Sequence, residues 1–115
     1  MRNLLLAAVT TLVAVPAFAA DLATGDQIKA AIAGNTVQGD MLDAGAYTEF
    51  YLADGVIRGK DYTGAWTIQG NEMCFDYGEG ADCWSVRIDG GNVTWVKDGV
   101  DDGTGTIVAG NPNNY

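Results

Sequence analysis

The chain has 115 residues, with 6 basic and 15 acidic side chains and no histidine. This length suits one domain, and the absence of histidine excludes Ser-His and Cys-His nucleophilic catalysis. The acidic charge disfavours nucleic acid and anionic lipid surfaces as partners, and it leaves a cationic ligand or a basic protein partner open.

The first residues have the three-part pattern of a secretory signal peptide. Arg2 precedes an apolar run from Leu4 to Val15, and the small residues Ala17 and Ala19 fit the preference of signal peptidase. We expect cleavage after Ala19, or one residue later. A membrane anchor is disfavoured because a helix needs about 20 apolar residues to cross a bilayer. A lipoprotein is disfavoured because no cysteine lies near the cleavage site.

The sequence therefore predicts a signal peptide over residues 1–19 and a single exported domain over residues 20–115, in the periplasm of a Gram-negative cell or secreted from it. Without Arg2, the mature chain has 5 basic side chains against 15 acidic ones, a balance of −10. The acids are scattered, which indicates a solubilising surface. A domain of this size buries only about 60 to 65% of its unfolded surface, so a covalent crosslink would help to stabilise it.

One short amphipathic helix is predicted from Thr24 to Gly34. Thr24 and Gln27 have capping-box spacing, and Gly34 can end the helix in a left-handed conformation. Ile28 and Ile32 lie four residues apart and share a face. We expect this helix to pack across a sheet or across the mouth of a barrel.

From Asn35 onward the hydrophobic period becomes two, and glycine-containing turns recur. Two-residue hairpin turns are predicted at Asp54-Gly55, Gly70-Asn71, Gly78-Glu79 and Gly90-Gly91. The eight predicted strands are Thr36 to Met41, Tyr47 to Ala53, Val56 to Lys60, Gly64 to Gln69, Glu72 to Tyr77, Asp82 to Asp89, Asn92 to Lys97 and Thr104 to Ala109.

These turns also predict which residues lie opposite each other across the hairpins. The predicted pairs are Ile68 with Met73, Trp66 with Phe75, Met73 with Trp84, Ile88 with Val93, and Val86 with Trp95. All lie on one face, and the predicted core is Trp66, Ile68, Met73, Phe75, Tyr77, Trp84, Val86, Ile88, Val93 and Trp95. The tail from Gly110 to Tyr115 is predicted to be a loose end.

Strands with one apolar face must close on themselves or pack as two layers. We therefore predict an all-β fold: a small antiparallel up-and-down barrel, or a barrel-like meander, of about eight strands with one short N-terminal helix. A closed or nearly closed barrel is favoured over a sandwich.

Cys74 and Cys83 are predicted to form a structural disulfide. The Gly78-Glu79 turn places them opposite each other in a non-hydrogen-bonded pair, where Cα atoms approach to about 4.5 Å. An oxidising compartment would preserve the bond. The spacing does not fit a dithiol oxidoreductase, and two cysteines without histidine are a poor zinc site.

No catalytic, cofactor-binding or metal-binding residues are predicted. Ser85, the only serine, lies in a predicted strand without a nucleophile elbow. Paired carboxylates for glycoside hydrolysis are disfavoured, because large side chains are expected to fill the interior. The acidic segment from Asp98 to Gly103 lacks the ligand spacing of an EF-hand, so it is interpreted as a turn with at most weak calcium contact.

Aromatic residues could supply a platform on which a ligand stacks, although core packing is the favoured interpretation. The aromatic residues considered are Trp66, Trp84, Trp95, Tyr47, Tyr51, Tyr62 and Tyr77.

Several short segments together resemble small secreted proteins of alphaproteobacteria whose domain has no assigned function. These segments are Gly34-Asn35-Thr36-Val37, Tyr51 with Ala53-Asp54-Gly55, Gly64-Ala65-Trp66, Met73-Cys74-Phe75, Cys83 and Gly110-Asn111-Pro112. The resemblance covers nearly the whole mature chain. It implies an exported β-rich domain with a hairpin cysteine pair, and it carries over no catalytic residues.

The first hypothesis for function is a non-enzymatic envelope protein that binds another protein or the cell wall. The second is a small-molecule carrier that uses the barrel mouth under the helix. A periplasmic barrel that inhibits a protease is a further alternative, but residues 20–23 are short for an inhibitory strand. Nothing in the sequence points to an enzyme.

Overall fold

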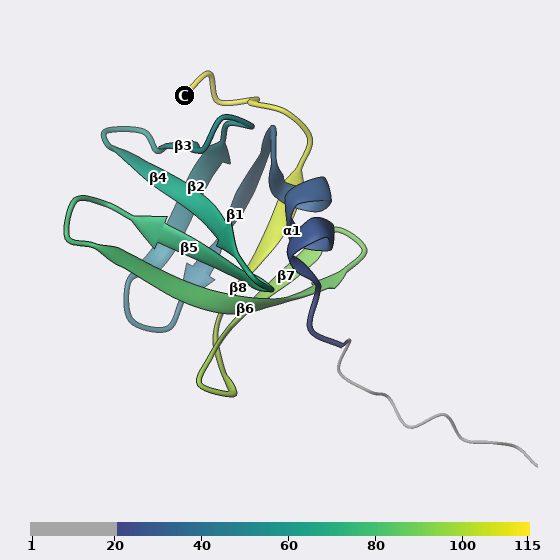
Figure 1. The fold of residues 1–115 in the computed structure, drawn as a ribbon. Helices are drawn as coiled ribbons and strands as arrows, with labels where there is room; N and C mark the ends of the chain where they lie inside the picture. Colours follow the sequence, from purple (N-terminus) through teal and green to yellow (C-terminus); the bar gives the residue numbers. More distant parts are fainter. Residues whose placement is uncertain (1–20) are drawn as a thin grey trace, which may run out of the picture.

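The computed structural model describes residues 21–115, so the predicted signal peptide lies outside the described residues. These residues form a closed barrel of eight strands, each antiparallel to its neighbours in sequence, with one short helix (Figure 1). The predicted up-and-down barrel is confirmed. Its elements are α1 (Gly25–Ile32), β1 (Asn35–Met41), β2 (Gly45–Tyr51), β3 (Val56–Arg58), β4 (Thr63–Gln69), β5 (Glu72–Asp76), β6 (Ala81–Asp89), β7 (Asn92–Lys97) and β8 (Val100–Val108).

Pairing between the first and last strands closes the barrel. β1 and β8 pair from Thr36 opposite Val108 to Met41 opposite Gly103. Closure leaves no strand edge unpaired at this seam. The strands approach closely there, because a side chain on Gly39 would collide with the Thr104 carbonyl oxygen.

Helix α1 covers one end of the barrel. Both hydrogen bonds of the predicted capping box between Thr24 and Gln27 are present. Ile28 and Ile32 are fully buried, and the helix contacts β1, β4 and β5. The Gly25 N–H donates to the side-chain oxygen of Asn71 in the β4–β5 turn, at 2.9 Å. The predicted helix thus closes a barrel mouth.

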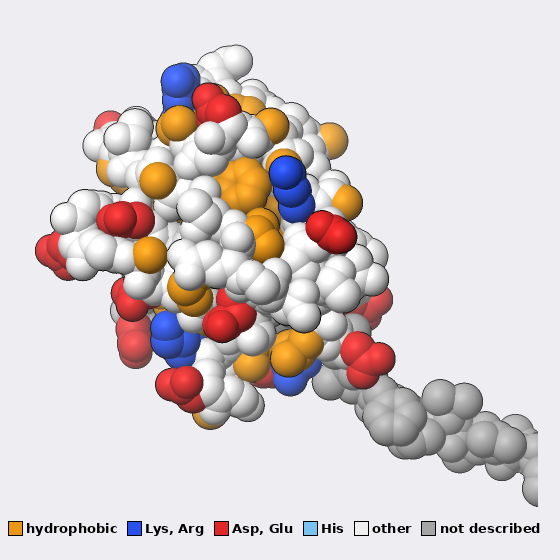
Figure 2. All heavy atoms as spheres, viewed as in Figure 1, with side chains coloured by type: hydrophobic (Ala, Val, Ile, Leu, Met, Phe, Trp, Pro, Cys, Tyr) orange, Lys and Arg blue, Asp and Glu red, His pale blue; other side chains and the backbone are white. Residues whose placement is uncertain are grey.

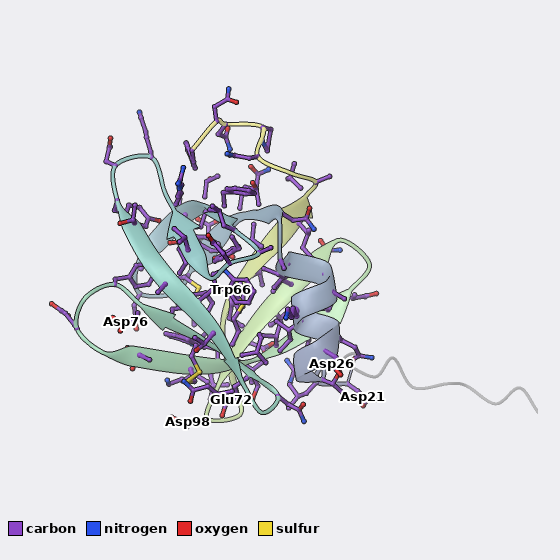
Figure 3. All side chains as sticks on the ribbon, turned by 45° about the horizontal axis from the view of Figure 1, so that its top comes forward. Asp21, Asp26, Trp66, Glu72, Asp76 and Asp98 are labelled. Atoms are coloured by element: carbon purple, nitrogen blue, oxygen red, sulfur yellow. A yellow bond between two sulfur atoms is a disulfide. The ribbon has the colours of Figure 1, made fainter. Side chains whose placement is uncertain are left out.

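The predicted register of the central hairpins is confirmed. Ile68 lies opposite Met73, Trp66 opposite Phe75, Met73 opposite Trp84, Ile88 opposite Val93, and Val86 opposite Trp95. Trp66 points into the interior (Figure 3). Most of the predicted core is buried, while Ile68, Trp84 and Ile88 are partly buried against it.

One predicted core residue is placed differently. Tyr77 is 50% exposed, because it follows the last residue of β5 and stands at the rim of the barrel. Besides Ile28 and Ile32 of the helix, other hydrophobic residues outside the predicted core set are buried: Ala23, Val37, Tyr51, Ile57, Cys74 and Val96.

Three connections differ from the predicted ones. The last pair of the β5–β6 hairpin is Asp76 with Ala81, so its connection has four residues (77–80) and not the predicted two, although the predicted register is kept. Leu52 and Val56 are hydrogen-bonded across the β2–β3 turn, so this hairpin has a three-residue loop and not the predicted two-residue turn at Asp54-Gly55. β8 begins at Val100, four residues before the predicted start. The predicted acidic turn is a tight hairpin at Asp98-Gly99, where both residues have positive φ (50° and 77°). Asp-Gly is a strong signal for this turn.

Cys74 and Cys83 form the predicted disulfide across the β5–β6 hairpin, with Cα atoms 3.9 Å apart. Their neighbours Phe75 and Trp84 point into the barrel. Side chains alternate between the faces of a strand, so the disulfide fastens this hairpin from the outer face.

The C-terminal tail is attached to the barrel rather than loose. The Thr36 hydroxyl donates to the Gly110 carbonyl at 2.7 Å, and the Gly110 N–H donates to the Asn35 side chain at 3.0 Å. The Asn111 side chain in turn makes two hydrogen bonds with the backbone of Tyr115. The backbone pairing of β8 ends at Val108, and beyond it these side-chain hydrogen bonds hold the tail on the barrel.

Carboxylate side chains are spread over the visible face of the molecule and do not gather in one patch (Figure 2). Asp26 lies in the first turn of α1, and Asp21 lies just before the helix (Figure 3). This distribution matches the predicted solubilising surface.

Removal of the disulfide is expected to lower stability without changing the fold. For a ten-residue loop, the chain-entropy model predicts that the Cys74→Ala/Cys83→Ala double variant loses about 2 to 3 kcal/mol of unfolding free energy. Urea unfolding followed by tryptophan fluorescence measures this loss. A reductant should destabilise the parent protein and leave the double variant unaffected. Equal midpoints for the oxidised parent and the double variant would contradict the expectation.

The glycine at the β1–β8 seam supplies a second test. Gly39→Ala places a methyl group against the backbone of β8, which cannot move aside. The variant should therefore lose about 1 to 3 kcal/mol of unfolding free energy. Gly91→Ala is the matched control, because a Cβ there meets nothing within 4 Å and the backbone φ is not positive. Urea midpoints should fall for the first variant only. A comparable fall for both would contradict the assigned packing of the seam.

Candidate ligand-binding site

A cavity of about 430 Å³ opens at the end of the barrel opposite α1. In an up-and-down meander, successive connections lie at alternate ends, so residues 42–44, 59–62, 77–80 and 98–99 share the end far from the helix. The cavity lining includes residues from three of these connections. The lining residues are Met41, Asp43, Ala44, Ala46, Tyr47, Glu49, Tyr51, Tyr62, Phe75, Tyr77, Trp84, Trp95 and Asp102.

The position and size of this cavity differ from the sequence-based expectation. The helix fills the mouth under which a ligand was expected, and the large side chains do not fill the interior completely. Two glycines of β8 make room for neighbouring side chains of the barrel interior. A side chain on Gly105 would collide with Tyr47 and Val37, and one on Gly103 would collide with Met41. At these two positions β8 has no side chain, and the side chains of Met41, Val37 and Tyr47 occupy the space instead.

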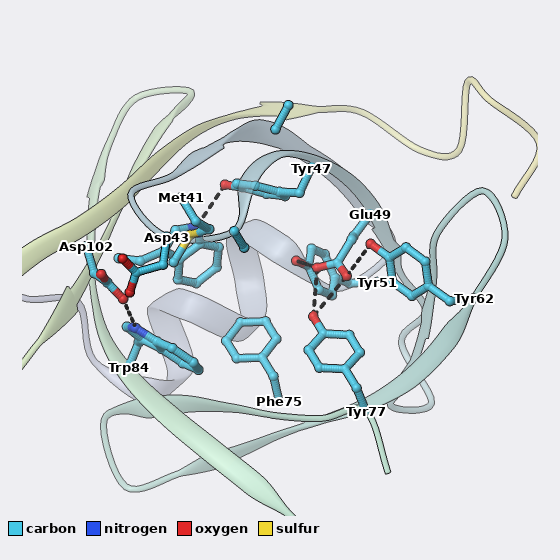
Figure 4. A pocket seen from close by; sticks show the side chains of 13 residues that line it. Met41, Asp43, Tyr47, Glu49, Tyr51, Tyr62, Phe75, Tyr77, Trp84 and Asp102 are labelled. Atoms are coloured by element: carbon cyan, nitrogen blue, oxygen red, sulfur yellow. Dashed lines mark hydrogen bonds between the residues drawn. The ribbon is translucent and has the colours of Figure 1, made fainter. Parts of the chain in front are cut away.

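A buried carboxylate, Glu49, lies at one side of the cavity among three tyrosines (Figure 4). Tyr51 donates to Oε1 at 2.7 Å and Tyr62 donates to Oε2 at 2.8 Å. The Tyr77 hydroxyl lies 2.9 Å from both oxygens. Glu49 is only 5% exposed. Burial of a carboxylate is costly unless it is hydrogen-bonded, and these hydroxyls reduce that cost.

Three elements meet at this cluster. Period-two alternation along β2 turns Tyr47, Glu49 and Tyr51 to the same inner face. Tyr62 comes from the β3–β4 turn and Tyr77 from the end of β5, and their rings pack edge to face with centroids 6.0 Å apart. The bond to Glu49 accounts for the position of Tyr77 at the rim rather than in the core.

A second acidic position lies on the other side of the cavity. The indole N–H of Trp84 donates to Asp102 at 3.0 Å (Figure 4). The pairing of β7 with β8 shifts between Trp95 and Val96, so that Asp102 is the extra residue of a β-bulge. Bulges redirect side chains, and this one brings Asp102 to the cavity wall while Asp101 pairs with Arg87.

Aromatic rings form much of the remaining wall. Phe75 packs edge to face on Tyr51, Trp84 and Trp95, with centroids 5.3 to 6.1 Å apart. The indole N–H of Trp95 donates to the Tyr47 hydroxyl at 2.8 Å, and that hydroxyl donates to the Thr104 carbonyl at 2.9 Å. These bonds hold the rings in fixed orientations.

Burial makes these tyrosines hard to ionise. Desolvation, partly offset by the hydrogen bond from Trp95, raises the pKa of Tyr47 to about 12. Desolvation and the nearby charge of Glu49 raise the pKa of Tyr51 well above its ordinary value. The pKa values of Tyr62 and Tyr77 are raised by desolvation and by their interactions with Glu49. The four phenols therefore remain hydrogen-bond donors at neutral pH.

Most of the aromatic residues considered from the sequence come together in this cavity. All of them line it except Trp66, which packs in the core. Core packing, the favoured interpretation, is confirmed for Tyr51 and Trp95, which belong to the core and also line the cavity. Tyr62 and Tyr77 are exposed at the rim. Glu49 was missed, although its place between Tyr47 and Tyr51 at period two was a usable signal.

Other residues singled out from the sequence lie elsewhere. Ser85 and the cystine of Cys74 and Cys83 do not line the cavity, and the acidic segment contributes only Asp102. Among residues 21–115, no group of three His, Cys, Asp or Glu side chains is arranged to hold a metal ion. Within the same residues, no helix is both long and apolar enough to cross a membrane.

No protein-family profile, curated protein or solved structure matches the chain at a significant level. The resemblance to small secreted alphaproteobacterial domains stays a prediction.

The raised tyrosine pKa values predict alkaline destabilisation. A phenol that keeps its proton in the native state loses it in the unfolded chain near its ordinary pKa of 10.0. The stability that these phenols contribute is thus complete below about pH 10 and is lost as the pH rises through the native pKa values. Urea midpoints at increasing pH measure the fall, and phenolate absorbance should appear together with unfolding. Tyr77→Phe should make the fall shallower. Ionisation of all four cavity tyrosines near pH 10 in a protein that is still folded would contradict the expectation.

Proposed function

We propose that the protein is an exported barrel that binds a small molecule in the cavity opposite α1. One observation carries the proposal: a cavity of about 430 Å³ lined by aromatic rings and a few oriented polar groups. Small-molecule sites have volumes of about 300 to 1,000 Å³ and this kind of lining. This favours the carrier hypothesis over a module that binds a protein or the cell wall.

The rim of the cavity supports the same proposal. Exposed large hydrophobic side chains are found at the open end in Leu42, Tyr62, Tyr77 and Val100, whereas Leu22 lies near the helix. Apolar side chains around a mouth provide a surface over which an apolar ligand can enter. They are too few to resemble the large apolar patch of a stable protein interface.

We propose binding without catalysis. The lining residues include no serine, cysteine or lysine to act as a nucleophile. Both carboxylate oxygens of Glu49 already accept hydrogen bonds from tyrosines, which suits a fixed recognition group better than a proton-transfer group. A periplasmic or secreted location is part of the proposal, and the disulfide and the signal-like N-terminal sequence support it.

A neutral fluorescent probe tests whether the cavity accepts a ligand. N-phenylnaphthylamine, which is uncharged at neutral pH, should bind saturably with one molecule per chain and show enhanced fluorescence. Ala44→Trp should abolish or strongly weaken this binding, because residue 44 lines the cavity from the exposed β1–β2 connection, so a large ring there would obstruct the mouth without disturbing the core.

Ala65→Trp is the matched control, since Ala65 is exposed on a strand but does not line the cavity. It should bind the probe as the parent does. Absence of saturable binding, or equal binding by the two variants, would contradict the proposed site.

A further inference from the structure

The side chains around the cavity offer acceptors but no free donor. Each O–H or N–H of the lining side chains donates within the wall. Tyr51, Tyr62 and Tyr77 donate to Glu49. Trp84 donates to Asp102, Trp95 to Tyr47, and Tyr47 to the Thr104 carbonyl. A ligand that presents carboxylate or phosphate oxygens would find no unused side-chain donor, whereas a ligand with N–H groups or a positive charge would find acceptors.

The charge of the cavity has one sign. Asp43, Glu49 and Asp102 line it, and no lysine or arginine does. Among residues 21–115 the only ion pair joins Arg87 to Asp101, so no basic side chain lies within 4 Å of the Glu49 carboxylate. The tyrosine hydroxyls that surround Glu49 are neutral. A carboxylate that is 5% exposed and has no counter-charge is an unusual arrangement, because a buried charge is normally paired.

The aromatic rings add a second attraction for a cation. Ring faces attract positive charge, and cages of several rings recognise ammonium groups in this way. The same barrel has one such contact of its own: Lys97 Nζ lies 4.5 Å from the centre of the Trp84 ring. The Glu49 cluster and the Trp84–Asp102 pair stand on opposite sides of the cavity, with Phe75 between them in the view of Figure 4. Rings and carboxylates therefore face the same space.

From these contacts we propose that the ligand is a small organic ammonium ion, with its positive group near Glu49 and its apolar body against the aromatic rings. The inference rests on the proposed function and specifies the ligand class of the same cavity. The volume of about 430 Å³ accommodates an amine with one ring or a short alkyl body. The acidic surface of the whole protein would also concentrate cations near the mouth.

Three compounds with nearly the same skeleton test the charge requirement. Phenethylamine is a cation at neutral pH, phenethyl alcohol is neutral and phenylacetate is an anion. Isothermal titration at physiological salt, which screens long-range attraction, should show phenethylamine binding at least about tenfold more tightly than the alcohol. Phenylacetate should show no measurable binding.

A charge-neutral variant tests whether Glu49 causes this preference. Glu49→Gln keeps an acceptor oxygen for the tyrosines and removes the negative charge, so affinity for the amine should fall to near that for the alcohol. Glu72→Gln removes the same charge from an exposed site outside the cavity and should keep the full preference. If Glu49→Gln does not fold, Asp102→Asn takes its place in the test. Asp102→Asn should reduce the preference for phenethylamine over phenethyl alcohol, and its circular dichroism spectrum should match that of the parent.

The outcomes separate the ligand class from the proposed function. Equal affinity for amine and alcohol, tighter binding of phenylacetate, or an unchanged preference in both cavity variants would overturn the inference. If N-phenylnaphthylamine still binds in the cavity in that case, the proposed function stands without a cationic ligand. If neither that probe nor any of the three compounds binds, the proposed function itself fails.

Discussion

The hydrogen-bonded pairing of β1 with β8 is the constraint on which the rest of the structure depends. Without it, the eight strands would be an open sheet with two free edges and one exposed apolar face. With it, the inner face becomes an enclosed interior, one end of which α1 covers. Glycines permit the closure, because Gly39 lies where β8 leaves no room for a side chain. Closure also creates the cavity, since a ring of strands has a second mouth opposite the helix.

The hairpin of β5 and β6 links stability to the cavity. Its outer face has the disulfide between Cys74 and Cys83, and its inner face carries Phe75 and Trp84 into the cavity wall. Successive side chains of a strand point to opposite faces, so each cysteine lies on the outer face next to an aromatic residue on the inner face. The crosslink therefore holds two wall residues in position without contacting a ligand.

Glu49 is the feature that distinguishes this interior from an ordinary apolar core. A carboxylate inside a small barrel is unfavourable unless its oxygens are hydrogen-bonded, and three tyrosines from β2, the β3–β4 turn and the end of β5 supply those bonds. The effect of these interactions is also visible in Tyr51, Tyr62 and Tyr77, whose pKa values are raised by burial and by the negative charge of Glu49. Polar groups that are this well oriented in an apolar wall are typical of recognition sites.

Local patterns in the sequence determined the strands, the capped helix, the central hairpin register and the cysteine pair. Each depends on residues close together in the chain, and a two-residue turn such as Gly70-Asn71 is sufficient to place Trp66 opposite Phe75. The turn at Asp98-Gly99 was equally local, and its signal was available in the sequence. Only the tertiary structure decided which mouth the helix closes, because that depends on all eight strands forming a ring. It alone also brought Tyr62 and Tyr77 to Glu49, since contacts across a barrel join residues with no fixed spacing in the chain.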